Sequence, residues 1–280
     1  GIQDSVGSNN GTNNGATEIQ TNVWTPRLNG ESDTLPSTAL VSSDLQFNSA
    51  YSSFSLDFDG SGNVVNLGNT DSLKLRSGDF TFSVWINPDS WGSGYKGIYV
   101  NNNTNGVFIG KGSGNEFVLR IFNVSNIISY STLPSINTWT HICITRNDGL
   151  CSLFYNGSSV ATATSTHDFS GSADVFIGSD NAGARFDGKL DELSIFNKAL
   201  NQAEITSIYN NGYPKDITAL APINWWRLGE DAYFNGNDFI IPNQITGAPN
   251  GTSNGMPATA LVADAPGSYA AGLGSSLALA

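Results

Sequence analysis

The sequence predicts an all-β fold, a jelly-roll sandwich with one short helix after its last strand. Short segments in which apolar and polar residues alternate follow one another along the middle of the chain. Turn sequences rich in Asn, Gly and Asp separate these segments. Charged residues make up only 13% of the 280 residues, which favours strands and turns over salt-bridged helices. Regularly spaced short strands of this kind are typical of sandwiches and jelly rolls.

Alternation defines the strands one by one. In FSLDFDG, the apolar Phe54, Leu56 and Phe58 are separated by polar residues, as in a half-buried strand. Residues 141–163 read as a hairpin because an Asp-Gly pair is a strong turn signal. The other predicted strands are GNVVNLG (62–68), DFTFSVWINP (79–88), GIYVNN (97–102), GVFIGKG (106–112), EFVLRIFN (116–123), NIISYST (126–132), ADVFIGSD (173–180) and GKLDELSIFN (188–197).

One helix is predicted, NQAEITSIYNNG at residues 201–212. Asn201 is a good N-cap, and Glu204 three residues later completes a capping box. Ile205 and Ile208 share one face, and the final Asn-Gly pair ends the helix. We expect this helix to pack across one end of the sandwich.

The two cysteines, Cys143 and Cys151, fall in the hairpin 141–163. With a turn around Asp148, Cys151 would face Thr145, and Cys143 would be its diagonal neighbour. Diagonal positions are too far apart for easy bridging. The sequence therefore predicts two half-buried thiols and no disulfide, and the spacing excludes a CxxC-type metal site.

The middle of the chain, about residues 50–212, resembles the laminin-G-like, concanavalin A-like jelly-roll family. FSLDFDG, FTFSVWINP and the hairpin that Trp139 leads into carry the likeness. The most specific piece is GKLDELSIFNKALNQAEITSIYNNG (188–212), which resembles the final strand and capped helix of the family. Asn156 stands in a turn where many relatives have Asp. The resemblance implies a concanavalin A-like sandwich.

A short sequence occurs twice, as NNGTNNG (9–15) and as PNGTSNG (249–255). The second copy follows NWWRLGE (224–230), which resembles the opening strand of the family. Together with the second copy, NWWRLGE also resembles repeats that are found in surface and virion proteins of bacterial viruses. We therefore expect a chain cut out of phase from something longer. The predicted parts are a laminin-G-like jelly roll at 1–212, a linker at 213–223, and a partial second repeat or strand-donating extension at 224–280.

The repeat allows three arrangements: tandem modules, a segment 224–230 that completes the sheet of its own chain, or one that completes the sheet of the next chain. Trp225 and Trp226 are adjacent, so one faces the core and the other faces outward. The outward ring is either covered by another segment or part of an assembly interface. We favour self-completion within an assembly-forming structural protein.

Composition and motifs exclude several classes of protein. The net charge of −12 and the pI of 4.3 argue against nucleic acid as a partner. No apolar run reaches the roughly 18 residues of a membrane helix, so no membrane insertion is expected. Glycosidases of this fold need alternating carboxylates on one strand, whereas Asp191 and Glu192 are adjacent and should point to opposite faces. His141 and His167 lack a nucleophile motif, so the sequence predicts no enzyme.

A structural calcium ion is implied by the resemblance, since many jelly rolls of this type hold one. The resemblance points to Asp191 on the last strand and to the turn that begins at Asp59, because first and last strands lie side by side. The alternative is that Asp191 accepts backbone N–H bonds and Asp59 caps its own turn.

A ligand site is expected in the loop PDSWGSGYKG (88–97), because lectin-like sites use exposed aromatic residues with amide side chains nearby. The predicted ligand-binding residues are Trp91, Tyr95, Asn101 and Asn103, with Asn102 and Asn105 close in sequence. The alternative is that Trp91 tucks under its loop. Trp85 and Trp139 lie on core strands and are predicted to be packing residues.

Two functions remain. The first is a non-enzymatic structural or adhesive component of an extracellular or viral assembly, such as a virion decoration, fibre or surface protein. Its partners would be copies of itself or other subunits, at an extracellular location or on a virion surface. The alternative is a calcium-dependent or calcium-stabilised module that binds surface glycans.

Overall fold

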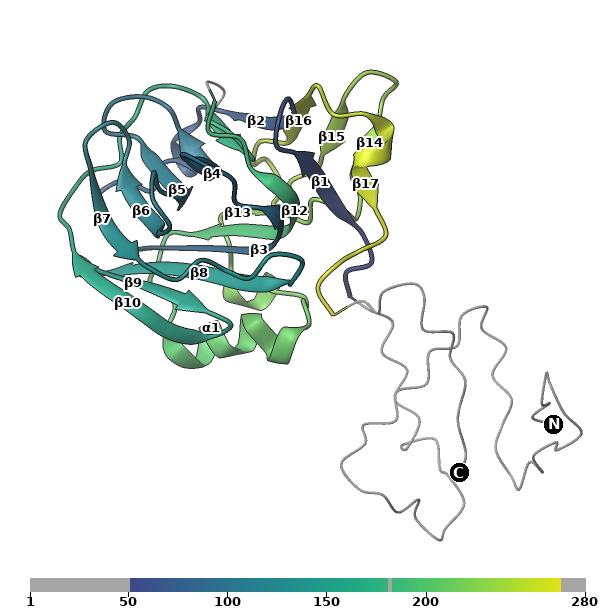
Figure 1. Cartoon of the computed structure of the whole chain (residues 1–280). Coiled ribbons are helices and arrows are strands. Elements are labelled where there is room, and N and C mark those ends of the chain that lie inside the picture. The colour runs from purple at the N-terminus through teal and green to yellow at the C-terminus, as the bar shows by residue number, and fades with distance from the viewer. Residues whose placement is uncertain (1–50, 181–182, 268–280) are drawn as a thin grey trace, which may run out of the picture. The chain divides into compact units, whose positions relative to one another are not determined.

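Two antiparallel β-sheets face each other in the computed structural model, which describes residues 51–180 and 183–267 (Figure 1). We call them sheet I and sheet II. Sheet I contains eight strands in the order β10-β9-β8-β3-β12-β1-β17, with β13 also paired to β12. Sheet II contains nine in the order β14-β15-β16-β2-β11-β4-β5-β6-β7. The predicted all-β sandwich is confirmed.

The strands of the two sheets follow the predicted segments closely and continue beyond them. Sheet I consists of β1 (Ser55–Asp59), β3 (Phe80–Ser90), β8 (Thr140–Asn147), β9 (Leu150–Tyr155), β10 (Ser158–Thr164), β12 (Asp187–Phe196), β13 (Asn224–Trp226) and β17 (Leu261–Val262). Sheet II consists of β2 (Val64–Gly68), β4 (Lys96–Asn101), β5 (Val107–Lys111), β6 (Phe117–Ile121), β7 (Ser125–Tyr130), β11 (Val175–Ile177), β14 (Tyr233–Phe234), β15 (Phe239–Ile241) and β16 (Gly251–Asn254). Single 3-10 turns lie at Asp71–Leu73, Asn210–Gly212, Thr218–Leu220 and Ala258–Ala260.

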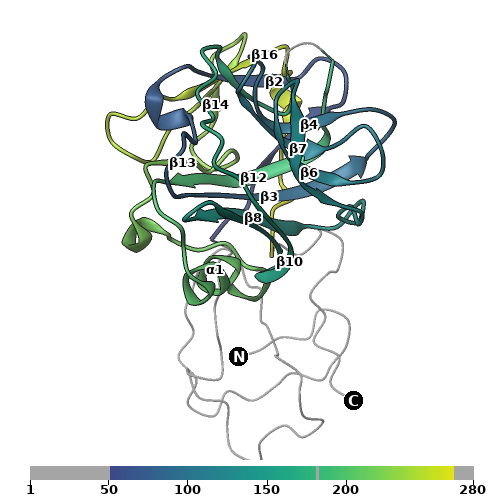
Figure 2. The ribbon, with the colours of Figure 1, turned by 90° about the vertical axis from the view of Figure 1, so that its left-hand side faces the viewer.

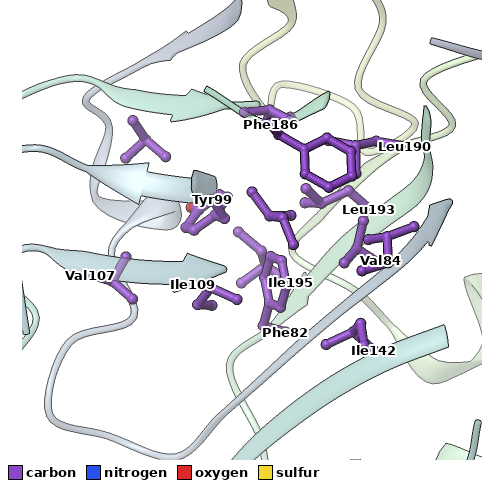
Figure 3. Packing of buried hydrophobic residues seen from close by; sticks show 14 of the residues in the cluster. Phe82, Val84, Tyr99, Val107, Ile109, Ile142, Phe186, Leu190, Leu193 and Ile195 are labelled. Carbon is purple, nitrogen blue, oxygen red and sulfur yellow. The ribbon is translucent and has the colours of Figure 1, made fainter. Parts of the chain in front are cut away.

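The main core fills the space between the sheets, because alternate residues of each strand point inward. Figure 3 shows side chains from both sheets meeting there, among them Phe82, Val84, Leu190, Leu193 and Ile195 of sheet I and Tyr99, Val107 and Ile109 of sheet II. Phe54 was predicted on this face but precedes β1 and is exposed. The core therefore begins at Leu56.

Helix α1 (Gln202–Tyr209) begins with the predicted capping box between Asn201 and Glu204. It ends at Asn210, which adopts the left-handed conformation one residue earlier than expected. Ile205 and Ile208 pack with outward-facing side chains of sheet I such as Phe154. The helix thus covers the outer face of this sheet, beside β8 and β10 (Figure 2), and not one end of the sandwich as predicted.

The segment after α1 belongs to the same folded unit as the strands before it. Strand β13 pairs with the second half of β12, while β1 pairs with the first half, so β1 and β13 share one edge of β12. Strand β16, formed by the second copy of the repeated sequence, pairs with β2 in sheet II. Residues 224–262 therefore add strands to both sheets. The first copy, residues 9–15, lies outside the described residues.

The hairpin β8–β9 turns at Asp148 and Gly149, which both have positive φ, as a tight hairpin turn requires. Its register differs by one residue from the prediction, because Cys151 faces Arg146 and not Thr145. Cys143 and Cys151 are free, as predicted, but fully buried. Cys143 packs under α1 and Cys151 in the main core, so the two thiols lie on opposite faces of sheet I.

Candidate functional site

The predicted ligand loop does not present Trp91 to solvent. Its side chain is 9% exposed, its indole N–H donates to the carbonyl of Pro134 at 2.7 Å, and its ring meets Phe186 edge-on at 5.8 Å. An indole N–H with a hydrogen-bond partner and a buried ring are typical of a packing residue. Trp91 tucks under its loop, so its predicted place at a ligand-binding surface is corrected.

Tyr95 is the aromatic residue of this loop that reaches the surface, with 36% exposure. Its ring meets Phe108 edge-on at 5.6 Å, and the guanidinium of Arg120 lies 5.2 Å from the ring centroid. Arg120 also donates to the side-chain oxygen of Asn126 at 2.9 Å. Phe108, Arg120 and Asn126 are cross-strand partners on β5, β6 and β7. We call these four residues the tyrosine–arginine cluster.

Asn101 and Asn103 do not join this cluster. Tyr95 precedes the first residue of β4, whereas Asn101 is the last residue of that strand. Asn101 is buried, and its amide donates to the carbonyls of Gly171 and Ala173 at 3.2 Å and 2.7 Å. Its oxygen accepts from the backbone N–H of the exposed Asn103 at 3.4 Å. Asn101 thus holds loops together, and the predicted ligand residues form no single site.

The predicted calcium pair, Asp59 and Asp191, is not brought together. Asp59 lies opposite Asp187, four residues along β12 from Asp191. The Asp59 carboxylate caps its own turn, accepting backbone N–H groups of Ser61 and Gly62 at 2.9 Å each. Although burial acts to raise it, these hydrogen bonds lower the pKa of Asp59 to about 2. Asp59 therefore follows the alternative interpretation.

Asp191 instead lies next to Glu192 at a β-bulge. On β12, Asp191 pairs with Trp85 and Ser194 with Ser83, so β12 has one more residue than β3 in this interval. Glu192 takes the left-handed conformation with φ 49°. The bulge turns the Glu192 carboxylate toward that of Asp191, which corrects the prediction that these neighbours point to opposite faces.

A third carboxylate, that of Glu230, completes the group. Carboxylate oxygens of Asp191, Glu192 and Glu230 lie within 4.8 Å of one another. The hydroxyl of Ser52 bridges two of them, donating to Asp191 at 2.6 Å and to Glu230 at 2.9 Å. Glu230 also accepts the backbone N–H groups of Ser53 and Phe54, the latter at 3.0 Å. The group lies where β1 and β13 meet along β12.

Arg227 supplies the positive charge of this group. Its Nε donates to Glu192 at 2.9 Å, and a terminal nitrogen lies 3.6 Å from Glu230. The same guanidinium donates to the carbonyl of Tyr51 and lies 4.2 Å from the centroid of its ring. The second oxygen of Glu192 accepts the indole N–H of Trp225 at 2.7 Å. We call Asp191, Glu192, Glu230 and Arg227 the acidic junction.

Burial controls the protonation of the acidic junction. Burial and the nearby charge of Glu192 raise the pKa of Asp191 well above its usual value. Burial raises the pKa of Glu192 to about 7 against the opposing effect of Arg227. Three carboxylates share one guanidinium, so protons or a further cation would relieve the excess negative charge.

The acidic junction fits a divalent cation poorly as it is arranged. Calcium needs six to eight oxygen ligands. Here the oxygens of Asp191, Glu192 and Glu230 already accept hydrogen bonds from Ser52, Trp225, Arg227 and backbone N–H groups. The guanidinium of Arg227 also contacts two of the three carboxylates, those of Glu192 and Glu230. Calcium stays a prediction, with Glu192 and Glu230 in place of Asp59 beside Asp191.

Trp225 and Trp226, predicted at an assembly interface, are both buried within the chain. Trp226 lies in the main core, and its indole N–H donates to the carbonyl of Pro249 at 3.0 Å. Trp225 faces the opposite side, where it packs with Ile205 and Ile217 in the α1 cluster. The ring that points away from the core is thus covered by the chain's own segments.

One serine–histidine contact was not anticipated from the sequence. Ser83 Oγ lies 2.8 Å from Nε2 of His141, because the two residues lie on neighbouring strands. Both are buried, and Tyr209 of α1 stacks over the imidazole at 6.2 Å. Among the described residues, none forms a hydrogen bond with Nδ1 of His141, and burial lowers the pKa of this imidazole to about 3. A substrate cannot reach this pair, which differs from a working Ser–His dyad.

Sequence reasoning missed that Arg227 and Glu230 lie beside Asp191 and Glu192. Both belong to NWWRLGE, which was expected to complete a sheet through its tryptophans. The available signal was the opposite charge of two residues three apart in this segment. In the structure β13 pairs with β12, the strand that carries Asp191 and Glu192, so unlike charges meet there.

A family model described as "Concanavalin A-like lectin/glucanases superfamily" matches residues 59–206, just over half of the chain. Over 167 residues the chain is 25% identical to Adhesion G-protein coupled receptor V1 of Danio rerio, covering 50% of this chain and 2% of that protein. The chain thus spans a small fraction of this relative.

Among solved structures, a carbohydrate-binding protein from Bacteroides ovatus ATCC 8483, titled as putative, superimposes with a TM-score of 0.58. The two chains are 17% identical, and the match covers 77% of this chain and 61% of that one. At an identity this low, the structural similarity shows a shared fold alone. Nowhere in the described chain is a helix long and apolar enough to cross a membrane.

Proposed function

The chain belongs to the concanavalin A-like lectin/glucanases superfamily, and from this premise we propose that it is a non-catalytic module that attaches to surface glycans. The observation that carries the proposal is the tyrosine–arginine cluster on the outer face of sheet II. Family membership supports a binding role, and the cluster supplies the surface for it.

The tyrosine–arginine cluster has the chemistry that sugar recognition needs. The half-exposed ring of Tyr95 offers an apolar face on which a pyranose can stack. Arg120 and Asn126 add hydrogen-bond donors and acceptors beside it. All of these residues except Tyr95 lie on strands, so their backbone is held by the sheet.

A glycan array tests this proposal. We expect the parent protein to bind a defined set of glycans, and Tyr95→Ala to lose that binding. Tyr233→Ala is the matched control, because Tyr233 is 56% exposed at the other edge of sheet II. Equal binding by the parent and Tyr95→Ala would remove the cluster from the site. Absence of glycan binding by the parent would refute the proposed function.

The non-catalytic part of the proposal has its own support. The Ser83–His141 pair is sealed under α1, and the acidic junction binds its own arginine. Incubation with the glycans that score on the array, followed by mass spectrometry, should show them unchanged. Released fragments would overturn this part.

The finer proposal is an adhesive or structural role in an extracellular assembly such as a virion or fibre. It is supported by the resemblance of NWWRLGE to repeats of bacterial-virus surface proteins. Because Trp225 and Trp226 are covered within the chain, assembly would use other residues. Negative-stain microscopy and size-exclusion chromatography test it, with a large discrete assembly expected and a monomer at high concentration contradicting it. Repeating the array with EDTA tests calcium dependence.

A further inference from the structure

A second polar surface lies on the outer face of sheet I, next to the acidic junction along β12. Asp57 on β1 pairs with Lys189 on β12, and Lys189 pairs with Asn87 on β3. Residues paired in this way point to the same side of a sheet. Asp187 lies two residues before Lys189 on β12 and therefore on the same face of that strand.

Four aspartates surround Lys189, and we call them the aspartate patch: Asp57, Asp89, Asp187 and Asp264. Lys189 donates to Asp89 at 2.9 Å and lies 4.0 Å from Asp264. Asp264 also accepts the indole N–H of Trp139 at 2.9 Å. The half-buried Trp139, predicted as a packing residue, is thereby fixed at the border of the patch.

The patch contains more negative charge than its lysines balance. Burial, then the charges of Asp89 and Asp264 against the opposing Lys189, raise the pKa of Asp57. Burial and Asp89 likewise raise the pKa of Asp187, against the opposing charges of Lys96 and Lys189, so two lysines face the four aspartates of the patch. The carboxylates of Asp57 and Asp187 are partly exposed. Lys189 and Trp139 donate their hydrogen bonds to the other two aspartates of the patch, Asp89 and Asp264.

Asn87 provides an independent observation beside these carboxylates. Its side chain is 6% exposed, and its amide oxygen accepts no hydrogen bond in the described chain. A buried amide oxygen without a donor is energetically unfavourable. Asn87 shares the face of Lys189, so its oxygen is available to a donor that enters the patch.

The spacing of the patch disfavours a compact metal ion. Within the residues described, the acidic junction alone brings three ligand atoms of acidic, histidine or cysteine side chains within 4.8 Å. The aspartates of the patch are more widely spread, around a lysine that already has partners. A larger ligand that carries separate N–H and O–H donors suits this arrangement better than a divalent cation.

We propose that the aspartate patch binds a glycan that carries protonated amino groups, that is, an amino sugar. The ammonium group would donate to Asp57, Asp187 and the amide oxygen of Asn87. The exposed part of the Trp139 ring would contact the adjoining pyranose. Amine and carboxylate form charge-assisted hydrogen bonds, which are about twice as strong as neutral ones.

An acidic surface with an aromatic border could also attract a basic protein segment. The sugar is favoured because a flat indole fixed by Asp264 suits stacking on a pyranose ring, and because the chain has the fold of lectins. The inference rests on the proposed function in taking the ligand to be a sugar. It uses a different face of the molecule, so the two can fail separately.

Calorimetric titration of the full chain tests the inference, with a glucosamine tetrasaccharide at a pH where its amines are protonated. The fully N-acetylated tetrasaccharide is the matched ligand, because it has the same backbone without the charges. We expect the amine form to bind at least about tenfold more tightly, which corresponds to one charge-assisted hydrogen bond. Equal affinities, or no binding of the amine form, would overturn the inference.

Variants locate the site. Asp57→Asn combined with Asp187→Asn should weaken binding of the amine form about tenfold or more, and Trp139→Ala should weaken both forms. Asp148→Asn is the control, because it removes the same charge from an exposed turn where positive φ suits Asn. Unchanged affinity in the double variant would also overturn the inference. Glycan binding that depends on Tyr95 alone would leave the proposed function standing and reject this site.

Discussion

Replacing Arg227 by Met tests whether the acidic junction holds β1 and β13 together along β12. The side chain of Arg227 is 14% exposed, and that of Glu192 is 7% exposed, so this ion pair is largely shielded from water. The change removes the 2.9 Å bond to Glu192, the 3.6 Å contact with Glu230 and the stacking on Tyr51. Met preserves much of the apolar volume.

We expect the free energy of unfolding to fall by about 3–5 kcal/mol at neutral pH, as when one partner of a buried ion pair is deleted. Urea denaturation monitored by tryptophan fluorescence measures it. Lys198→Met is the control, because the Lys198–Glu204 pair is exposed, and its loss should change stability by less than about 1 kcal/mol.

The deficit of Arg227→Met should depend on pH. The folded chain raises the pKa of Glu192 from 4.5 to about 7, so its contribution to stability is greatest at low pH and is lost as pH rises. Arg227 counteracts this rise, so without it the pKa moves higher still. Below about pH 7 the folded parent and the folded variant both hold the Glu192 proton, so the deficit stays constant there, and it should grow only as pH rises above about 7. A deficit under about 1 kcal/mol at neutral pH, or one that shrinks as pH rises, would refute the role assigned to Arg227.

Three further outcomes are expected. Gly229→Ala should destabilise the fold by about 1–3 kcal/mol in urea denaturation, because the new Cβ would clash with the carbonyl oxygen of Phe54. Gly62→Ala, whose Cβ meets nothing within 4 Å, should not, and equal effects would contradict the argument. Arg146→Met should lower the free energy of unfolding by at least about 3 kcal/mol. The reason is that the buried guanidinium donates to the carbonyls of Leu75, Arg76, Gly78 and His167. An unchanged urea midpoint would contradict this prediction. Because the acidic junction fits a divalent cation poorly, EDTA should leave the melting temperature unchanged, whereas a rise on adding calcium would support the calcium prediction.

Most of the fold could be predicted from the sequence because its signals are local. Alternation in β1 and β3, the Asp-Gly turn of the hairpin and the capping box of α1 each depend on neighbouring residues. The position of α1 could not be predicted in this way. Its apolar residues require a partner surface, and the outer face of sheet I provides one only after β8, β9 and β12 have paired.

Exposure was harder to predict than strand position. Trp91 lies in a loop rich in Gly and Ser, which favours an exposed ring. Its burial depends on Pro134 and Phe186, which are 43 and 95 residues away along the chain. Trp139, which precedes β8, remains half-buried, and its indole N–H donates to Asp264, 125 residues away along the chain. For both tryptophans, distant residues decided the outcome.

The acidic junction shows why a strand pattern alone cannot place functional groups. Strict alternation sends Asp191 and Glu192 to opposite faces, and that rule holds only while both strands advance together. One extra residue on β12 breaks the rule, and Glu192 accepts a positive φ that costs about 1 kcal/mol or more. The bulge lies between the first residue of β1 and the last residue of β13, which share one edge of β12. A carboxylate pair there can accept Ser52 from the segment before β1 and Arg227 from the segment after β13. The irregularity is thus what allows the two strands to be joined along one edge of β12.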